Sequence, residues 1–159
     1  MPHITIEYVI MVPVLILQIF LFPLTASWLM NIWVDSRRTL ALQEVASHLG
    51  STIQQLYFAL NHETISAGTA TYSPELSPFI ENYNYIGNAT LRAVSGSADS
   101  SKVLSITLTL AKTKITVTTL VTLGPNVLWQ PSVFVSNSTH ACVSAMKNAT
   151  GTITLYFGE

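Results

Sequence analysis

The hydrophobic pattern divides the chain into an apolar run, an amphipathic stripe and a region of alternating residues. The apolar run extends from Tyr8 to Val34, which are 27 residues without one formal charge. Glu7 precedes the run and Asp35 follows it. The run is longer than the roughly 7 to 15 apolar residues of a cleavable secretory signal, and it exceeds the roughly 20 that cross a bilayer. Two environments suit such a segment: a bilayer or the apolar core of a helical polymer.

The second pattern is an apolar stripe that recurs every three or four residues, which is the spacing of one helix face. Together with the apolar run, it predicts one nearly continuous helix from about Ile4 to Leu60, roughly 85 Å long. Pro13 and Pro23 fall inside this helix, and proline is tolerated where neighbouring helices satisfy the freed backbone groups. The stripe should pack against the globular domain, other helices or both. Its members are Leu42, Val45, Leu49, Ile53, Leu56 and Leu60.

From Thr90 the pattern changes to a two-residue alternation, which is typical of strands with one buried face. Segments 104–110 and 115–122 alternate apolar residues with Ser or Thr, and they predict a hairpin that turns near Lys112. We therefore expect an α+β fold, in which a long N-terminal hydrophobic α-helix (1–60) is followed by an antiparallel β-sandwich-like globular domain (61–159). The segment 61–89 should be an ordered loop. Further strands are expected at 91–94, 127–129, 133–135, 141–146 and 153–157.

Composition limits the partners of the β-rich region. Charged residues make up 9 % of the chain, and Ser and Thr supply 27 of its last 99 residues. With a net charge of −1 there is no basic surface to neutralise phosphates, so we expect no nucleic-acid partner. The surface therefore depends for its solubility on hydroxyl groups or on groups attached to them.

Three sequons of the form Asn-Ala/Ser-Thr occur in this region, each beside a predicted turn. They make Asn88, Asn137 and Asn148 candidate sites for N-linked glycans. Glycosylation at any of them would place the β-rich domain outside the cell.

Sequence motifs of catalysis are absent: there is no GxSxG elbow, phosphate-binding glycine loop, CxxC or HExxH. Glu44 and His48 lie one helical turn apart, but two residues do not make a metal site. Ser138, His140 and Asp99 could form a triad by residue type alone. The single cysteine, Cys142, rules out an intrachain disulfide and is expected to be a small buried residue in a strand. We expect no enzyme activity, no cofactor and no metal.

Glu7 allows two interpretations. It can sit in the headgroup region or at a helix N-terminus, where a negative charge is favoured by up to about 1 kcal/mol. Alternatively, it pairs with the N-terminal amine of a neighbouring subunit inside a polymer, where an unpaired carboxylate would be costly.

The segment Ile4-Thr5-Ile6-Glu7-Tyr8-Val9-Ile10-Met11-Val12-Pro13 resembles the N-terminal helix motif of type IV pilin-like proteins, and in particular that of TadE-like pseudopilins. The glycosylatable, charge-poor β region is similar to that of archaeal pilins and archaellins. The resemblance implies that the hydrophobic helices bundle into a filament core and that the β domains cover the outside. Glu7 is the one residue to which the resemblance assigns a role, namely pairing with the N-terminal amine of a neighbouring subunit.

The expected function is therefore that of a structural subunit of an extracellular type IV pilus-like filament, which serves adhesion or motility. Its partners would be identical subunits, the membrane before assembly, and a secretion and assembly machinery. The alternative is a membrane-anchored minor pseudopilin or extracytoplasmic binding protein that forms no filament. The residues expected to mediate assembly are Glu7, Pro13, Leu17, Phe20, Pro23 and Leu24.

Two features depart from this expectation. Pilin precursors carry a short basic leader, yet nothing before Ile4 is basic, so the leader has been removed or the chain never had one. Arg37 and Arg38 follow the apolar run and would hold the β domain in the cytoplasm by the positive-inside rule, whereas the sequons indicate the outside. A basic leader, now lost, would resolve this conflict.

Overall fold

The computed structural model describes residues 3–94 and 100–158, with side chains from residue 9 onward. A single helix, α1, runs from His3 to Leu60, with Pro13 and Pro23 inside it, which confirms the predicted continuous helix. The chain divides into two compact units, Met1–Arg37 and Arg38–Glu159. The second unit contains the end of α1 and the strands β1 (Gly68–Tyr72), β2 (Tyr85–Ala93), β3 (Lys102–Leu110), β4 (Thr116–Leu123), β5 (Val127–Trp129), β6 (Val133–Val135), β7 (Cys142–Lys147) and β8 (Ile153–Gly158).

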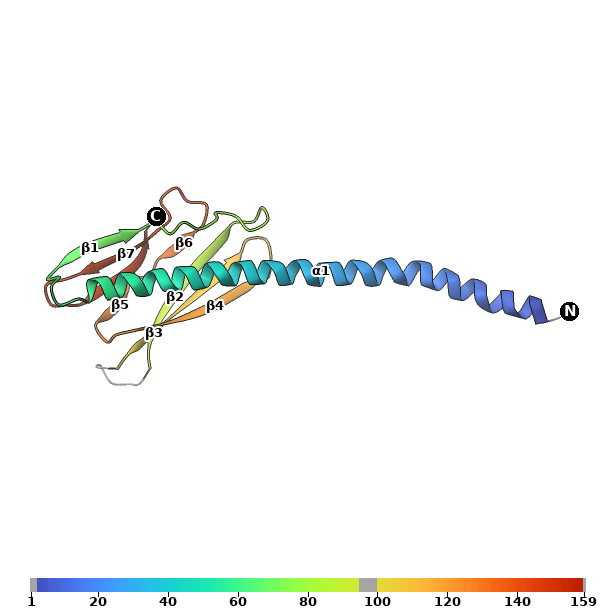
Figure 1. The fold of residues 1–159 in the computed structure, drawn as a ribbon, viewed down its shortest axis with the longest axis horizontal. Helices are drawn as coiled ribbons and strands as arrows, with labels where there is room; N and C mark the ends of the chain where they lie inside the picture. The colour runs from blue at the N-terminus through green and yellow to red at the C-terminus, as the bar shows by residue number, and fades with distance from the viewer. Residues whose placement is uncertain (1–2, 95–99, 159) are drawn as a thin grey trace. The chain divides into compact units, whose positions relative to one another are not determined.

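The strands form two four-stranded sheets, ordered β1-β7-β8-β5 and β4-β3-β2-β6 (Figure 1). The chain is therefore an α+β protein. Every strand pair is antiparallel except β5 with β8, which is parallel. The expectation of a wholly antiparallel domain is wrong for this pair. A parallel pair needs a crossover connection, and the chain between β5 and β8, which includes β6 and β7, provides one.

The predicted hairpin is confirmed as β3 and β4, which pair from Lys102 opposite Leu123 to Thr109 opposite Thr116. Lys112 has a positive φ of 58°, as a tight turn at this point requires. The buried face of this sheet carries the alternating apolar residues, and the exposed face carries the hydroxyls. The shorter strands at 127–129 and 133–135 also lie where the alternation predicted them.

The segment 61–89 is not simply a loop, because it contains β1 and the start of β2. β1 is a short edge strand in which only Ala70 is partly buried, so its sequence lacks the alternating large apolar residues that predict a strand. β2 begins at Tyr85 instead of the predicted residue 91. Its alternation is interrupted at Gly87, a buried position where a Cβ atom would lie 2.7 Å from Leu108. Tyr85 is fully buried, whereas Tyr72 and Phe79 remain about half exposed (47 % and 49 %).

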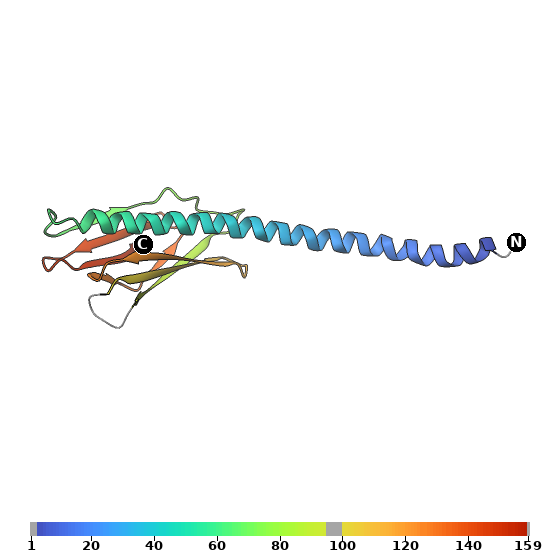
Figure 2. The ribbon, with the colours of Figure 1, turned by 60° about the horizontal axis from the view of Figure 1, so that its bottom comes forward.

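The end of α1 supplies one wall of the core of the second unit (Figure 2). The predicted stripe does pack on the domain, but its centre is slightly rotated: Ala46 and Tyr57 are buried, whereas Val45 and Leu56 are only partly buried. Gly50 allows this close approach, since a Cβ atom there would lie 3.0 Å from a methyl group of Val121 in β4. The fully packed face comprises Leu42, Ala46, Leu49, Ile53, Tyr57 and Leu60.

A tight turn contacts α1 at Arg38, where the second unit begins. Ile80 and Tyr83 exchange backbone hydrogen bonds of 2.9 and 3.0 Å, and the two residues between them, Glu81 and Asn82, both have positive φ (52° and 84°). Arg38 Nε donates to Glu81 Oε2 at 2.6 Å, and its guanidinium lies 5.2 Å from the centre of the Tyr83 ring. The turn therefore fixes this point of the helix to the domain by charge and by ring stacking.

Candidate assembly surface and modification sites

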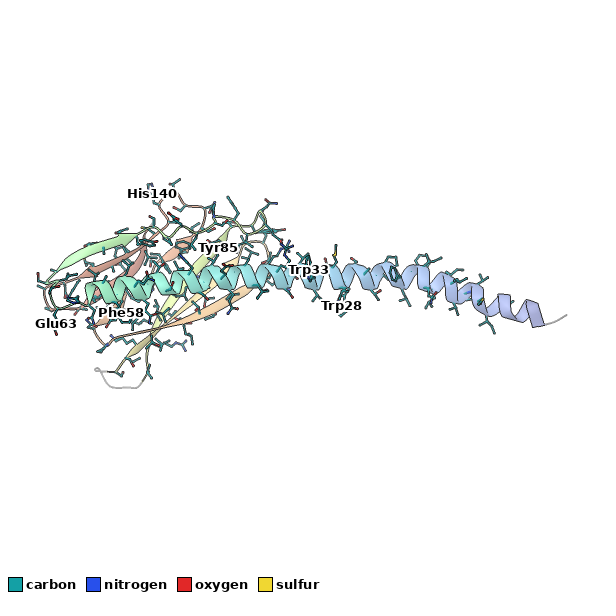
Figure 3. The ribbon with its side chains drawn as sticks, viewed as in Figure 1. Trp28, Trp33, Phe58, Glu63, Tyr85 and His140 are labelled. Carbon is teal, nitrogen blue, oxygen red and sulfur yellow. The ribbon has the colours of Figure 1, made fainter. Side chains whose placement is uncertain are left out.

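The first unit presents an uninterrupted apolar surface. Its large hydrophobic side chains from Val9 to Trp33 are all exposed, from 44 % at Ile32 to 76 % at Phe22. The most apolar stretch has a mean hydropathy of 2.4 and no buried residue, and α1 is long and apolar enough to cross a membrane. Trp28 and Trp33 project from α1 in this stretch (Figure 3). A soluble monomer rarely exposes so much contiguous apolar surface, so this surface marks an interaction site.

Four of the expected assembly residues share one face of α1. Pro13, Leu17, Phe20 and Leu24 are spaced by four, three and four positions, which aligns them along a continuous helix. Leu17, Phe20 and Leu24 are 59 %, 68 % and 66 % exposed. Glu7 lies within the helical backbone, but its side chain falls outside the described part of the structure. The interpretations of Glu7 therefore stay predictions.

The fifth described assembly residue, Pro23, lies in a groove of about 690 Å³. Proline has no N–H, so the carbonyl of Ile19 lacks its helical donor. Thr25 Oγ1 donates to the carbonyl oxygens of Leu21 and Phe22, at 3.0 and 2.9 Å, and not to that of Ile19. The sequence already predicts such freed backbone groups at Pro13 and Pro23, whereas the groove beside Pro23 is visible only in the structure. The groove is lined by Leu15, Gln18, Ile19, Leu21, Phe22, Pro23 and Thr25.

A second apolar groove follows along the same helix. It has a volume of about 610 Å³ and ends beside Trp33. The guanidinium of Arg37 lies 5.0 Å from the Trp33 ring centre, so the charge that ends the apolar run rests on an aromatic face. This arrangement suits a helix that leaves an apolar phase at this level. The lining residues are Ala26, Leu29, Met30, Ile32, Trp33 and Ser36.

All three sequon asparagines are exposed, but they differ in context. Asn148 lies directly after β7, and its Oδ1 accepts from Thr150 N, Thr150 Oγ1 and Thr152 N at 3.1, 2.7 and 2.9 Å. Asn137 follows β6 in a turn, with its Oδ1 3.5 Å from Asn84 Nδ2. Asn88 lies inside β2, opposite Thr107 on one side and Val133 on the other. The expectation that Asn88 flanks a turn is wrong, because the preceding Gly87 serves close packing and not a turn.

The residues considered for catalysis remain apart or unsupported. Glu44 and His48 are both exposed on α1. Ser138 Oγ accepts a hydrogen bond from the backbone N–H of His140 at 3.3 Å, which is a local turn contact, and Asp99 lies outside the described residues. Cys142 lies in β7 as expected, but it is only partly buried. Among the side chains that the structure describes, in residues 9–94 and 100–158, no three of His, Cys, Asp or Glu gather as a metal site would require.

Tyr85 is a titratable residue whose side chain is fully buried. Burial raises the pKa of its phenol from 10.0 to about 12, because the charged form would lose its hydration. Its hydroxyl donates to the carbonyl of Ser77 at 2.9 Å, while its backbone N–H donates to Ser136 Oγ at 2.9 Å. Ser136 Oγ in turn donates to the carbonyl of Pro78 at 2.8 Å. These bonds tie the segment between β1 and β2 to the sheet, so Tyr85 has a structural role.

Comparison with known proteins identifies no relative. No protein-family model, no curated protein and no solved structure matches the chain.

Proposed function

We propose that this chain is the structural subunit of an extracellular type IV pilus-like filament, used for adhesion or motility. Identical subunits bundle their N-terminal helices into an apolar core, and the β domains face outward. The observation that carries the proposal is the exposed apolar surface from Val9 to Trp33, on a helix whose continuation from Arg38 is packed into a folded domain. The first unit thus requires an apolar partner, whereas the second already has its own core.

The bilayer is the first environment of this helix. An apolar residue near the membrane centre contributes about −0.3 to −0.6 kcal/mol, so the 21 apolar residues between Tyr8 and Val34 favour insertion by several kcal/mol. Lipid tails are as apolar as the helix, so burial alone does not drive transfer into a polymer. Close packing along the Pro13–Leu24 face, pairing of Glu7 and the secretion machinery supply that step.

The β domain is proposed to be a glycosylated, sandwich-like module outside the cell. Its two sheets contribute to one core, in which Phe134 of β6 meets Phe157 of β8 at 5.6 Å between ring centres. The three sequon asparagines are exposed and so are accessible to modification. Mass spectrometry of peptides from the purified chain would show attached hexoses or N-acetylhexosamines. Unmodified Asn88, Asn137 and Asn148 would remove this support for an outside location.

Filaments sheared from cells and identified by mass spectrometry test the proposal. We expect this chain to be their principal component. If the chain stayed wholly in the membrane fraction and was absent from the filaments, the subunit function would be wrong. The membrane-anchored, non-filamentous alternative would then hold, since one helix of this composition suffices as an anchor.

A further inference from the structure

The apolar run contains one long polar side chain, Gln18, which is exposed on the rim of the Pro23 groove. Its amide makes no hydrogen bond to any described residue of the chain. In the apolar phase that the proposed function assigns to this helix, an unpaired amide costs several kcal/mol. An acceptor lies in the same groove, because Pro23 leaves the Ile19 carbonyl without its helical donor. Donor and acceptor are therefore neighbours on one helix: the Gln18 amide makes no hydrogen bond to the described residues, and the Ile19 carbonyl lacks its regular i+4 donor.

We propose that Gln18 and the Ile19 carbonyl form a self-association site between two copies of this chain. Gln18 Nε2 of one copy donates to the Ile19 carbonyl oxygen of the other, and the groove at Pro23 admits the incoming side chain. Two copies inserted in the same orientation place residues of the same number at the same depth in the membrane. The Gln18 amide of each copy therefore lies near the depth of the Ile19 carbonyl of the other. The inference rests on the membrane-inserted state of the proposed function, but not on filament formation.

A second copy is the occupant that the surroundings favour. Lipid tails carry no donor or acceptor at this depth. The groove is otherwise lined by apolar side chains and Thr25, whose hydroxyl is already bonded within its own helix. A charged partner would have no counter-charge anywhere between Tyr8 and Val34. The contact would also fix the register of the two helices, as a single buried amide does in coiled coils.

Self-association can be measured for the full chain in phosphatidylcholine vesicles, by energy transfer between donor and acceptor dyes attached after Glu159. We expect Gln18→Leu to lower the association constant by about 3-fold to about 20-fold, the range of interhelical hydrogen bonds in membranes. Leucine keeps the bulk and the apolar character of the run. A change in insertion is excluded by recovering both variants in equal amounts with the vesicles.

A matched control moves the amide while keeping the number of polar and apolar residues in the run. In the double variant Ile16→Gln/Gln18→Leu the amide stands about 200° around the helix, away from the Pro23 groove. We expect it to associate as weakly as Gln18→Leu. If the double variant associates as well as the unmodified chain, any amide suffices and the proposed site is wrong.

Pro23→Ala tests the acceptor. Alanine restores an N–H that binds the Ile19 carbonyl within the helix, so association should fall although the helix itself becomes more regular. Combining Pro23→Ala with Gln18→Leu should produce no further loss, because both remove the same contact. Additive losses, unchanged association in Pro23→Ala, or a monomeric unmodified chain would each overturn the inference. None of these outcomes would decide filament formation, which the composition of sheared filaments tests separately.

Discussion

The two halves of α1 belong to one continuous helix but have opposite relations to water. The first half, from Val9 to Trp33, is apolar on all sides and exposed, whereas the second half, from Arg38 to Leu60, buries one face and leaves polar residues outside. A backbone of the same conformation therefore carries two kinds of surface. The second half fills its own domain's core, and the first half has no partner among the described residues of this chain. The difference shows which half must find its partner in a membrane or another subunit.

The largest effect should come from placing a charge on the exposed half. Leu17→Asp or Phe20→Asp should abolish polymerisation, because an unpaired carboxylate in an apolar core is highly unfavourable. The β domain should stay folded, which circular dichroism of the detergent-solubilised chain would show. Leu120→Asp, at a position of the same 68 % exposure as Phe20 but in β4, is the matched control and should leave the domain folded and filaments intact. Normal filaments from Phe20→Asp would contradict the helical-core proposal.

The next effect concerns the buried half. Leu49→Ala should lower the free energy of unfolding of the second unit by about 2 to 5 kcal/mol, since Leu49 is fully buried and the change leaves a cavity. Leu29→Ala, at a position 65 % exposed in the first half, should change that free energy by less than about 0.5 kcal/mol. Denaturant unfolding of the full chain in detergent micelles measures both. Equal effects would mean that the two halves do not differ as described.

Alkaline pH should destabilise the second unit through Tyr85. Because burial raises the pKa of Tyr85 to about 12 from an ordinary 10.0, the unfolded chain loses this proton first as the pH rises. The stabilisation is thus complete below about pH 10 and is lost between about pH 10 and pH 12, amounting to about 2 to 3 kcal/mol. Unfolding measured across this range should show the loss in the unmodified chain and a smaller loss in Tyr85→Phe. Identical pH profiles would show that Tyr85 is not the group responsible.

The smallest effect is expected for the ion pair between Arg38, the first residue of the second half of α1, and Glu81. Arg38 and Glu81 keep 20 % and 37 % of their side chains exposed, so solvent screens their ion pair. A double-mutant cycle with Arg38→Ala and Glu81→Ala should give a coupling of less than about 1 kcal/mol. A coupling of several kcal/mol would indicate that the ion pair between Arg38 and Glu81, and not the apolar face of α1, holds the helix on the domain.

Much of this fold follows from periodicity. The helix from about Ile4 to Leu60, the hairpin turning near Lys112 and the short strands at 127–129 and 133–135 are confirmed within a few residues. β1 was missed because Ala70 is the one residue of this edge strand that packs against the core, and a single small residue makes no detectable alternation. The start of β2 was missed because Gly87 stands where an apolar side chain was expected. Both failures have one cause: the conformation and burial of these residues depend on contacts with residues that are distant in sequence.

The candidate site likewise has features that the sequence predicts and features that only the structure shows. The apolar run, the assembly residues and the sequons are read directly from the chain, and those members whose side chains the structure describes are mostly exposed. Asn88 was placed beside a turn, whereas pairing with β3 and β6 puts it on the exposed face of a sheet. The Pro23 groove was missed because it is formed by the spatial gathering of side chains around one turn of the helix.

The sequence by itself determined that this protein has a long helix with an uncharged first half, because charge and periodicity are local properties. It likewise determined an amphipathic continuation and a hydroxyl-rich β region. The tertiary structure alone decided which face of that continuation is buried, that β5 and β8 run parallel, and that Gly50 lets the helix approach β4. These depend on the fit between surfaces that meet only after folding, and no local pattern specifies such a fit.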